Sequence, residues 1–359
     1  MLGYIARRLL VSIPVLFGIL LVTFVLARSI PGDPCKAILG VKASPEVCAE
    51  FTRRFGFDRP IYVQFGLYMG RVLQGDFGNS IRFSRPVSII LIERLPMTIE
   101  LAVGGLILAL AIGVPLGLIS AMRHNTGIDV GAMIFANIGI SMPVFWLGLM
   151  LAYVFALMMK GTIFWLPPSG RLSAGLTSIP FYEVWGWAVE AGTAKANTLN
   201  FIANHFIFNS LITGDWKLLN DAIRHLILPV VALSTIPMAI IARMTRSSLL
   251  EVLGRDYVRT ARAKGAKERR VVMKHAMRNA LLPVVTILGL QMGGLLGGAV
   301  LTETVFGLAG VGRMLFEAIT ARDYPIIQAF TVVIAVSYMM INLIVDISYG
   351  FLDPRIRLD

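Results

Sequence analysis

The chain has 359 residues, of which 56% are hydrophobic and only 15% are charged, and its mean hydropathy is +0.75. This composition excludes an ordinary soluble domain and indicates a polytopic membrane protein. The formal net charge of +12 fits the excess of Lys and Arg that membrane insertion and anionic lipid favour, so we expect no nucleic-acid partner.

Six stretches without formal charge are candidates for membrane spans, because crossing the hydrocarbon core takes about 20 apolar residues. The fourth is short but can extend into its neighbours. Pro143 lies inside the third and predicts a kink or a tilted span. We therefore expect an all-α fold with six transmembrane helices, at residues 9–27, 101–122, 130–159, 226–242, 281–302 and 325–345.

The first stretch follows Arg7 and Arg8, as the apolar core of a cleaved signal peptide would. It is longer than a typical signal core, and its end is a poor cleavage site, so we expect a retained helix. The two arginines place the N-terminus in the cytoplasm, and six crossings return the C-terminus there. Arg123 and the eleven cations between residues 243 and 278 then lie in short inner loops, as the same rule favours.

Residues 29–97 mix aromatic and charged side chains between prolines, which predicts a small folded external region. Within it we expect a helix at 45–55 and a turn at 56–60. Cys35 and Cys48 both lie here, and either a disulfide or two free thiols stays open, because sequence separation does not test the geometry of the bond. Two cysteines cannot supply a four-ligand zinc site, so no metal site is expected.

Residues 160–225 are expected to form a second external insertion. Its charge-free part, 196–214, is long enough for a seventh crossing, but it contains several asparagines, which are costly in lipid. A seventh crossing would also place the cations of 243–278 outside. We therefore predict an amphipathic layer at the outer membrane surface, anchored by aromatic side chains that include Trp185, Trp187 and Trp216.

Polar side chains within the spans are candidates for lining a wet path through the membrane. Asn137, Ser141 and Gln291 lie centrally and either line such a path or tie helices together by hydrogen bonds. Glu303 lies at the outer end of the fifth span and Asp346 at the inner end of the sixth. Each is a pathway acid, a structural cap or a member of an ion pair.

Glycines recur at four-residue spacing in the fifth span, at positions 289, 293 and 297 and again at 294 and 298. This spacing lets helix backbones approach closely in a membrane. Packing within this chain and contact with a partner chain both remain open.

The chain lacks the motifs of several enzyme classes. It contains no Gly-x-x-x-x-Gly-Lys-Ser/Thr phosphate loop, no His-Glu-x-x-His and no nucleophile elbow. We therefore expect a non-catalytic protein. A membrane transporter that lacks a nucleotide site must be driven by an ion gradient or by a partner that hydrolyses ATP.

The basic segment 254–283 favours the partner, because it intersperses small residues with cations. A helix built this way presents a low Ala/Gly surface, flanked by positive charge, that another protein can approach closely. The residues concerned are Tyr257, Arg259, Thr260, Ala261, Arg262, Ala263, Lys264, Gly265 and Ala266.

This segment resembles the cytoplasmic coupling loop of binding-protein-dependent ABC importer permeases, in the form of the dipeptide/oligopeptide and nickel branch. The general pattern is Glu-Ala-Ala, three residues, Gly and later Leu-Pro. Arg259 and Thr260 replace its Glu and first Ala, whereas Ala261 and Gly265 match. The peptide branch resembles this sequence at the Arg259 position. Further matches are Leu282-Pro283, Pro31-Gly32-Asp33-Pro34, Glu93-Arg94-Leu95-Pro96, Leu301-Thr302-Glu303-Thr304-Val305-Phe306 and Leu352-Asp353-Pro354-Arg355.

The resemblance implies a MetI-like permease fold that moves dipeptides or oligopeptides across a bacterial or archaeal cytoplasmic membrane. It implies four partners: a second homologous permease, two ATP-binding subunits that carry ATP and Mg, and an extracytoplasmic peptide-binding protein. Asn137, Ser141, Gln291 and Glu303 become candidates for the translocation path. The implied parts are a first helix (1–28), the external region (29–97), a permease core (98–350) with its coupling loop (247–282), and a cytoplasmic tail (351–359).

Three alternatives remain. The same machine can import nickel or another small solute. An ion-gradient carrier would need a coupling-ion site near the membrane midplane, and an intramembrane protease would need a catalytic dyad within the spans. The sequence shows no convincing cluster of either kind.

Overall fold

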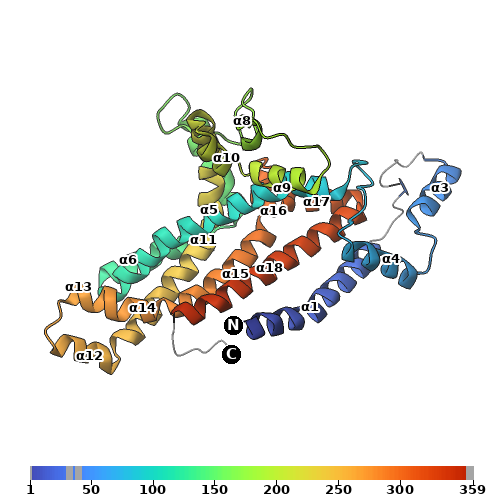
Figure 1. Cartoon of the computed structure of the whole chain (residues 1–359). Helices are drawn as coiled ribbons and strands as arrows, with labels where there is room; N and C mark the ends of the chain where they lie inside the picture. Colours follow the sequence, from blue (N-terminus) through green and yellow to red (C-terminus); the bar gives the residue numbers. More distant parts are fainter. Residues whose placement is uncertain (1, 30–34, 37–42, 353–359) are drawn as a thin grey trace.

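The computed structural model describes residues 2–29, 35–36 and 43–352, and this part of the chain is helical without a β-strand (Figure 1). The motif residues 31–34 and 353–355 and most of the expected tail 351–359 lie outside the described residues. The helices are α1 (Leu2–Ser29), α3 (Pro45–Phe55), α4 (Ile61–Leu73), α5 (Val87–Met122), α6 (Gly127–Ser141), α7 (Val144–Ala152), the π-helix η1 (Tyr153–Met158), α8 (Phe181–Val184), α9 (Ala194–Ala203), α10 (Phe206–Thr213), α11 (Trp216–Leu253), α12 (Asp256–Ala263), α13 (Glu268–Arg270), the π-helix η2 (Val271–Ala276), α14 (Met277–Ala280), α15 (Leu282–Gly298), α16 (Val300–Val305), α17 (Val311–Ala321) and α18 (Tyr324–Leu352).

Four helices are long and apolar enough to cross a membrane, namely α1, α5, α11 and α18. Two bent pairs add one candidate span each, which gives six: α6 with α7–η1, bent by 98°, and α13–α14 with α15, bent by 49°. The first break is far larger than the predicted kink at Pro143. Met142, the residue before Pro143, is extended (φ −109°, ψ 134°), because a following proline disfavours the helical conformation.

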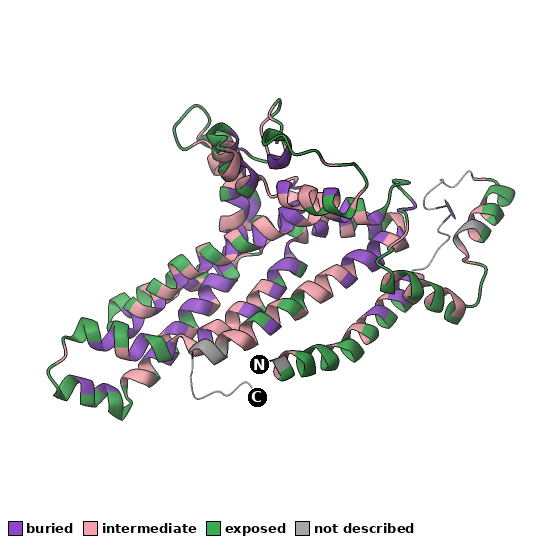
Figure 2. Cartoon of the chain, in the orientation of Figure 1, coloured by how far each residue is buried: buried purple, intermediate pink, exposed green. Residues whose placement is uncertain are grey.

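The centre of the bundle is α11, which packs along α5 and α6 (Figure 1). In its most apolar window 72% of residues are buried, against 11% in α1 and in α18. Figure 2 shows α1 as mostly exposed. Glycines allow the close approach. A Cβ on Gly113 or Gly117 would lie 2.7 or 2.5 Å from a backbone oxygen of α11, and one on Gly139 would lie 2.4 Å from Thr235 Cβ.

Gly117→Ala should therefore separate α5 from α11, because its methyl group meets the backbone oxygen of Ala242. We expect a loss of roughly 1–3 kcal/mol in stability, as for other overpacked cores. The measurement is the thermal midpoint of the purified chain in detergent. Gly131→Ala on α6 is the matched control, since nothing lies within 4 Å of its added Cβ. Equal midpoints for the two variants would contradict the close packing.

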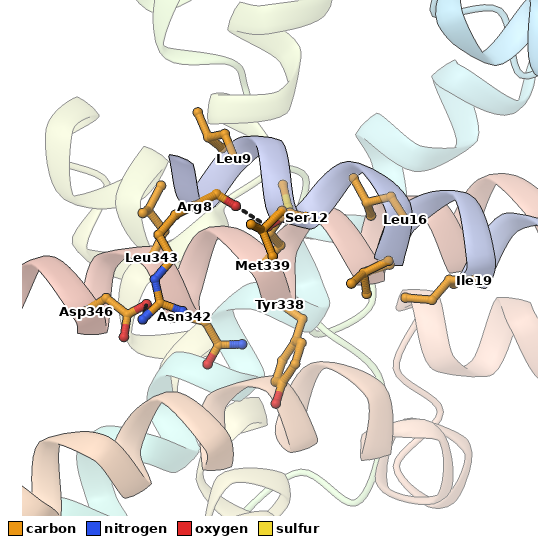
Figure 3. A pocket seen from close by; sticks show the side chains of 13 residues that line it. Arg8, Leu9, Ser12, Leu16, Ile19, Tyr338, Met339, Asn342, Leu343 and Asp346 are labelled. Carbon is orange, nitrogen blue, oxygen red and sulfur yellow. Dashed lines mark hydrogen bonds and ion pairs between the residues drawn. The ribbon is translucent and has the colours of Figure 1, made fainter. Parts of the chain in front are cut away.

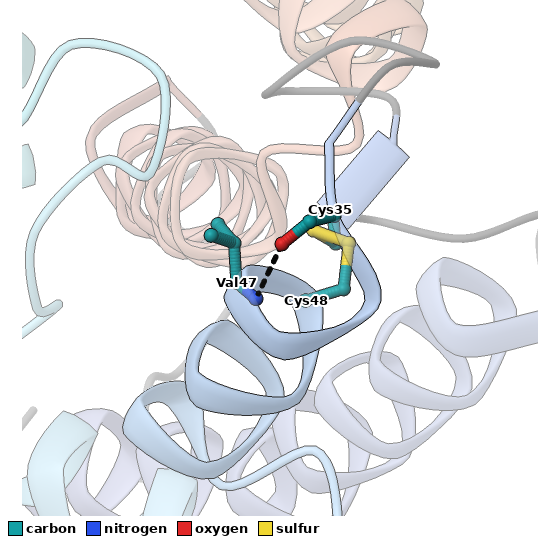
Figure 4. The surroundings of a disulfide bond; sticks show 4 residues. Cys35, Val47 and Cys48 are labelled. Carbon is teal, nitrogen blue, oxygen red and sulfur yellow. Dashed lines mark hydrogen bonds between the residues drawn. A yellow bond between two sulfur atoms is a disulfide. The ribbon is translucent and has the colours of Figure 1, made fainter.

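The first external region is held against the end of α1. The predicted helix at 45–55 is confirmed as α3, which begins after the Ser44 cap and ends at Gly56 in the left-handed conformation (φ +69°). Cys35 and Cys48 form a disulfide with a Cα–Cα distance of 5.5 Å (Figure 4). The guanidinium of Arg28 lies 3.7 Å from the ring centroid of Phe24, which packs against α4 through Phe65.

The second external region contains the stretch 196–214, which the structure divides between α9 and α10. These helices have 10 and 8 residues, too short to cross the hydrocarbon core. Asn209 is fully buried between them and the segment before α8, and its Oδ1 accepts a hydrogen bond from Phe181 N at 2.9 Å. At least one of the asparagines in this stretch, Asn209, thus serves internal hydrogen bonding. Trp185 and Trp187 remain about half exposed.

A buried ion pair fastens this second region to α5. Arg171 Nη2 donates to Glu100 Oε2 at 2.7 Å, and Ile207 N donates to Glu100 Oε1 at 2.9 Å. The Arg171 guanidinium also lies 3.6 Å from the ring centroid of Phe206. Burial lowers the pKa of Arg171 from its usual value, and the Glu100 carboxylate opposes that shift. The external region is therefore attached to a spanning helix at a specific point.

Candidate coupling surface and translocation path

The short helix α12 lies at the opposite end of the bundle from α8 and α10 (Figure 1). It follows α11 after a single turn at Gly254. Val258 and Ala261, three residues apart, face inward and are 0% and 9% exposed. They pack in an apolar cluster with Leu249 of α11 and with residues of η2 and α14, such as Val271. One face of α12 is thus committed to this chain's own core.

Gly265 ends α12 through its backbone conformation. Its φ is +78°, in the left-handed region that favours glycine. Its N–H donates to Arg262 O at 2.9 Å, and Ala266 N–H donates to Ala261 O at 3.3 Å. This is the Schellman arrangement of a helix C-terminus. Ala261 packs inward in this chain, whereas Gly265 is exposed and its backbone conformation is required locally, so the part of these two residues in docking stays a prediction.

The outward face of α12 consists of the other residues of the predicted coupling loop. Tyr257 is 43% exposed, and its hydroxyl accepts a hydrogen bond from Asn279 at 2.7 Å. Ala263 is exposed, whereas Ala266 is half-buried. We call the exposed set the coupling face, and it contains Tyr257, Arg259, Thr260, Arg262, Ala263 and Lys264.

Two cations of the coupling face have weak internal partners. Arg262 contacts Glu268 through two hydrogen bonds, at 3.1 and 2.7 Å, and Arg259 lies 3.5 Å from Asp256. All four side chains are at least 40% exposed. Exposed ion pairs contribute at most about 1 kcal/mol, so acidic groups of another protein can replace these partners at little cost.

The apolar cluster beneath α12 links the coupling face to two spans. Leu249 belongs to α11, and Ala276 and Ala280 lead directly into α15. A close-packed protein interior transmits the displacement of one helix to the helices packed against it. A shift of α12 therefore acts on α11 and α15 together.

A buried carboxylate joins three helices at the end of the bundle near α12. Asp129 of α6 is 3% exposed, and Arg246 of α11 donates to both its oxygens, at 2.8 and 2.7 Å. Ser120 of α5 donates to Oδ1, and Asn125 N donates to Oδ2 at 3.0 Å. Sequence reasoning missed this site. Its signal was an acid at the edge of the apolar stretch 130–159 and a cation soon after 226–242.

We expect Asp129→Ala to lower the thermal midpoint by several degrees, because it leaves Arg246 and the Asn125 N–H without their acceptor. The double variant Asp129→Asn/Arg246→Gln should recover part of the loss, since neither side chain is then charged. The comparison is made by thermal unfolding in detergent. If the single variant is as stable as the wild type, the three-helix junction is not what the geometry indicates.

A groove of about 490 Å³ runs along α6 from this junction, lined by Asn125, Asp129, Val130, Met133, Ile134, Asn137 and Arg246. Arg243 Nη2 of α11 donates to Asn137 Oδ1 at 3.0 Å, and Ser141 Oγ donates to Asn137 O at 3.2 Å. Arg243 and Ser141 are exposed and Asn137 is half-buried. This chain thus has an open polar face on α6 and α11.

The other candidates for the path fall into different places. Gln291 is half-buried on α15 and does not line the groove. Glu303 is 0% exposed: its carboxylate accepts from Thr98 Oγ1 at 2.6 Å and from Arg313 N at 2.8 Å. It caps α17, which is one of the alternatives left open above, and its role in the path stays a prediction. Asp346 pairs with Arg8 at 3.1 Å.

The glycine stripe of the fifth span packs partly within the chain. A Cβ on Gly289 would lie 2.7 Å from Val345, and one on Gly293 would lie 1.9 Å from the ring of Tyr338, both on α18. Nothing lies within 4 Å of the corresponding positions on Gly294 and Gly297. The part of α15 that carries Gly289 and Gly293 therefore packs against α18, whereas the space beside Gly294 and Gly297 is open.

A second carboxylate missed in the sequence is Asp323, which is fully buried before α18. It accepts hydrogen bonds from Ser80 Oγ at 2.5 Å and from Arg82 N at 3.1 Å. These partners lie in the turn that precedes α5. No local sequence pattern predicts this contact, because Ser80 and Arg82 are 243 and 241 residues away from Asp323.

The chain matches two family models. One, described as binding-protein-dependent transport system inner membrane component, covers residues 113–358. The other describes the N-terminal part of such membrane components and covers residues 1–102.

Several relatives are similar over their full length. A dipeptide transport system permease protein of Alkalihalophilus pseudofirmus is 45% identical over 99% of this chain and 100% of the relative. The corresponding Escherichia coli protein is 41% identical over 99% of both chains. An oligopeptide transport system permease protein of Bacillus subtilis is 41% identical over 99% of this chain and 100% of the relative. Among solved structures, a chain of the inward-facing MetNI methionine ABC transporter has 17% identity and a TM-score of 0.47, and the match covers 72% of this chain and 93% of that one.

Proposed function

Because the chain belongs to the family of binding-protein-dependent transport system inner membrane components, we propose that it is the permease subunit of an ATP-driven importer of dipeptides and oligopeptides. It is a non-catalytic, multi-pass inner-membrane protein, and ATP hydrolysis belongs to its partners. Nickel import is not favoured, since the similar full-length permeases named above carry peptides in their names.

The observation that carries the coupling mechanism is the two-sided character of α12. Its inner face is fixed to α11 and to the segment that leads into α15, and its outer face is exposed and cationic. We propose that an ATP-binding subunit receives this coupling face. Closure of two such subunits around ATP and Mg then moves α12, and with it the two spans.

Such coupling requires the partner to hold α12 differently in its open and closed states, because equal contacts in both would transmit no work. The weak pairs Arg262–Glu268 and Arg259–Asp256 allow this. Each arginine can exchange its own carboxylate for one on the partner as the partner moves.

The path itself is proposed to run along the polar face of α6 and α11. Arg243 lies just beyond the apolar stretch 226–242, and its exposed side chain beside Asn137 and Ser141 favours a wet surface at that end of the path. This chain supplies only one wall of such a path. The opposite wall is proposed to come from a second, homologous permease, and an extracytoplasmic peptide-binding protein delivers the substrate.

The proposed orientation places α12 and both termini in the cytoplasm and the regions around α3 and α8 outside. The cations near α12 support it, since short cytoplasmic loops are rich in Lys and Arg. The membrane is the cytoplasmic membrane of a bacterium or an archaeon.

The test is reconstitution. The chain, a second permease and two ATP-binding subunits are placed in proteoliposomes, and the binding protein is added with a dipeptide. We expect the dipeptide to accelerate ATP hydrolysis and to accumulate, whereas the chain alone accumulates nothing. Uphill dipeptide uptake by the chain alone on an ion gradient would establish the carrier alternative, and stimulation by Ni²⁺ but not by dipeptides would establish the metal alternative.

A further inference from the structure

A groove runs between α1 and α18 near the N-terminus of the chain (Figure 3). It has a volume of about 200 Å³, and its two ends differ in chemistry. Arg8, Asn342 and Asp346 line one end, and Leu16 and Ile19 line the other. The groove is therefore polar at the end that faces the cytoplasm in the proposed orientation and apolar toward the middle of the membrane.

The length of the groove matches one leaflet. Arg8 and Ile19 are 11 residues apart on α1, which corresponds to about 16 Å along the helix axis. Half of the hydrocarbon core measures about 15 Å. An acyl chain of the inner leaflet therefore fits along the groove with its headgroup beside Arg8.

The charge at the polar end favours an anionic headgroup. Arg8 Nη2 forms an ion pair with Asp346 Oδ2 at 3.1 Å, and Arg8 Nε donates to the Tyr4 hydroxyl at 3.0 Å. These contacts use two of the five N–H groups of a guanidinium, and the Arg8 side chain remains 52% exposed. Arg7, the preceding residue on α1, is a further exposed cation at this end of the helix but does not line the groove. Guanidinium groups bind phosphate oxygens with well-defined geometry.

We propose that this groove binds one anionic phospholipid of the inner leaflet. Its phosphate lies against Arg8, and one acyl chain lies between Leu16 and Ile19 of α1 and Ala335 of α18. The lipid thereby fills the space between α1 and α18, whose most apolar windows each have only 11% of their residues fully buried by this chain. The proposal depends on the orientation given above but not on the transported substrate.

The experiment uses the assembled transporter in nanodiscs with two photoreactive probes. These are phosphatidylglycerol and phosphatidylcholine with the same diazirine in one acyl chain. We expect phosphatidylglycerol to label peptides of α1 and α18 about fivefold more than phosphatidylcholine, as one cation near the membrane surface implies. Arg8→Gln should bring the ratio close to one.

Ala335→Trp should remove the labelling, because the indole fills the groove. Met340→Trp, also on α18 but outside the groove lining, is the matched control and should retain it. Three results would overturn the proposal: equal labelling by the two lipids in the wild type, equal labelling of the two tryptophan variants, or labelling of the isolated chain that disappears on assembly. The last would show that the second permease covers the groove. None of these results bears on peptide-stimulated ATP hydrolysis, so failure here is distinct from failure of the proposed function.

Discussion

We expect the Ala263→Trp variant to lose its ATP-binding subunits during purification while the permease itself stays folded. Ala263 lies on the exposed coupling face of α12, so an indole there meets the partner and not this chain. Disruption at the centre of an interface typically costs at least 2 kcal/mol, which corresponds to about thirtyfold weaker binding. The measurements are the affinity of the ATP-binding subunits for the permease and the peptide-stimulated rate of ATP hydrolysis.

A neighbouring position supplies the contrast. Ala261 is 9% exposed and faces the apolar cluster under α12, so Ala261→Trp should destabilise the permease by about 1–3 kcal/mol through overpacking. Ala191→Trp, exposed in the external region, should change neither binding nor stability. If Ala263→Trp binds the ATP-binding subunits as tightly as the wild type, the coupling face is elsewhere.

The second large effect is expected for Glu303→Ala. Removing the carboxylate leaves Thr98 Oγ–H and Arg313 N–H without the acceptor they have in the buried cap of α17. Each unsatisfied buried donor costs about 1–3 kcal/mol, so we expect a loss of about 2–6 kcal/mol in the free energy of unfolding. Unfolding by denaturant in detergent micelles measures this loss.

Glu303→Gln provides the matched control, because its carbonyl oxygen can still accept one of the two hydrogen bonds. It should retain most of the stability and most of the transport activity. A pathway role for Glu303 would produce the opposite result: both variants would fold normally, and both would change transport or substrate selection.

Mechanically, the two variants probe opposite ends of the same bundle. Ala263 lies on the helix that is proposed to receive motion from the ATP-binding subunit, and Glu303 fixes the junction of α5, α16 and α17 near the other end. Between them runs α11, which packs against α5 and α6 through Gly113, Gly117 and Gly139. Because its backbone lies so close to those of α5 and α6, α11 is a stiff connection between the coupling face and the proposed translocation path.

Several properties were readable in the sequence because they depend on local chemistry. The six apolar stretches follow from composition and length, and the fold class they predict is confirmed. The helix at 45–55 follows from Ser44, Pro45 and Gly56, whose conformational preferences act within a few residues. The end of α12 likewise follows from Gly265, whereas the coupling role of this helix stays a prediction.

Other properties depended on neighbours that are distant in sequence. The inward turn of Ala261 follows from the cluster that α11, η2 and α14 build beneath it, although its three-residue spacing from Val258 was a signal. The disulfide was one of two open alternatives, because the sequence does not give the distance between two cysteines.

The sequence by itself determined the class of protein and the approximate spans, since hydrophobicity, proline and glycine act locally. Only the tertiary structure decided which partner each buried polar side chain contacts. Glu303 finds Thr98 across 205 positions of the chain, and Arg246 finds Asp129 across 117. A buried charge is tolerated only beside its partners, and those partners are brought together by the packing of whole helices.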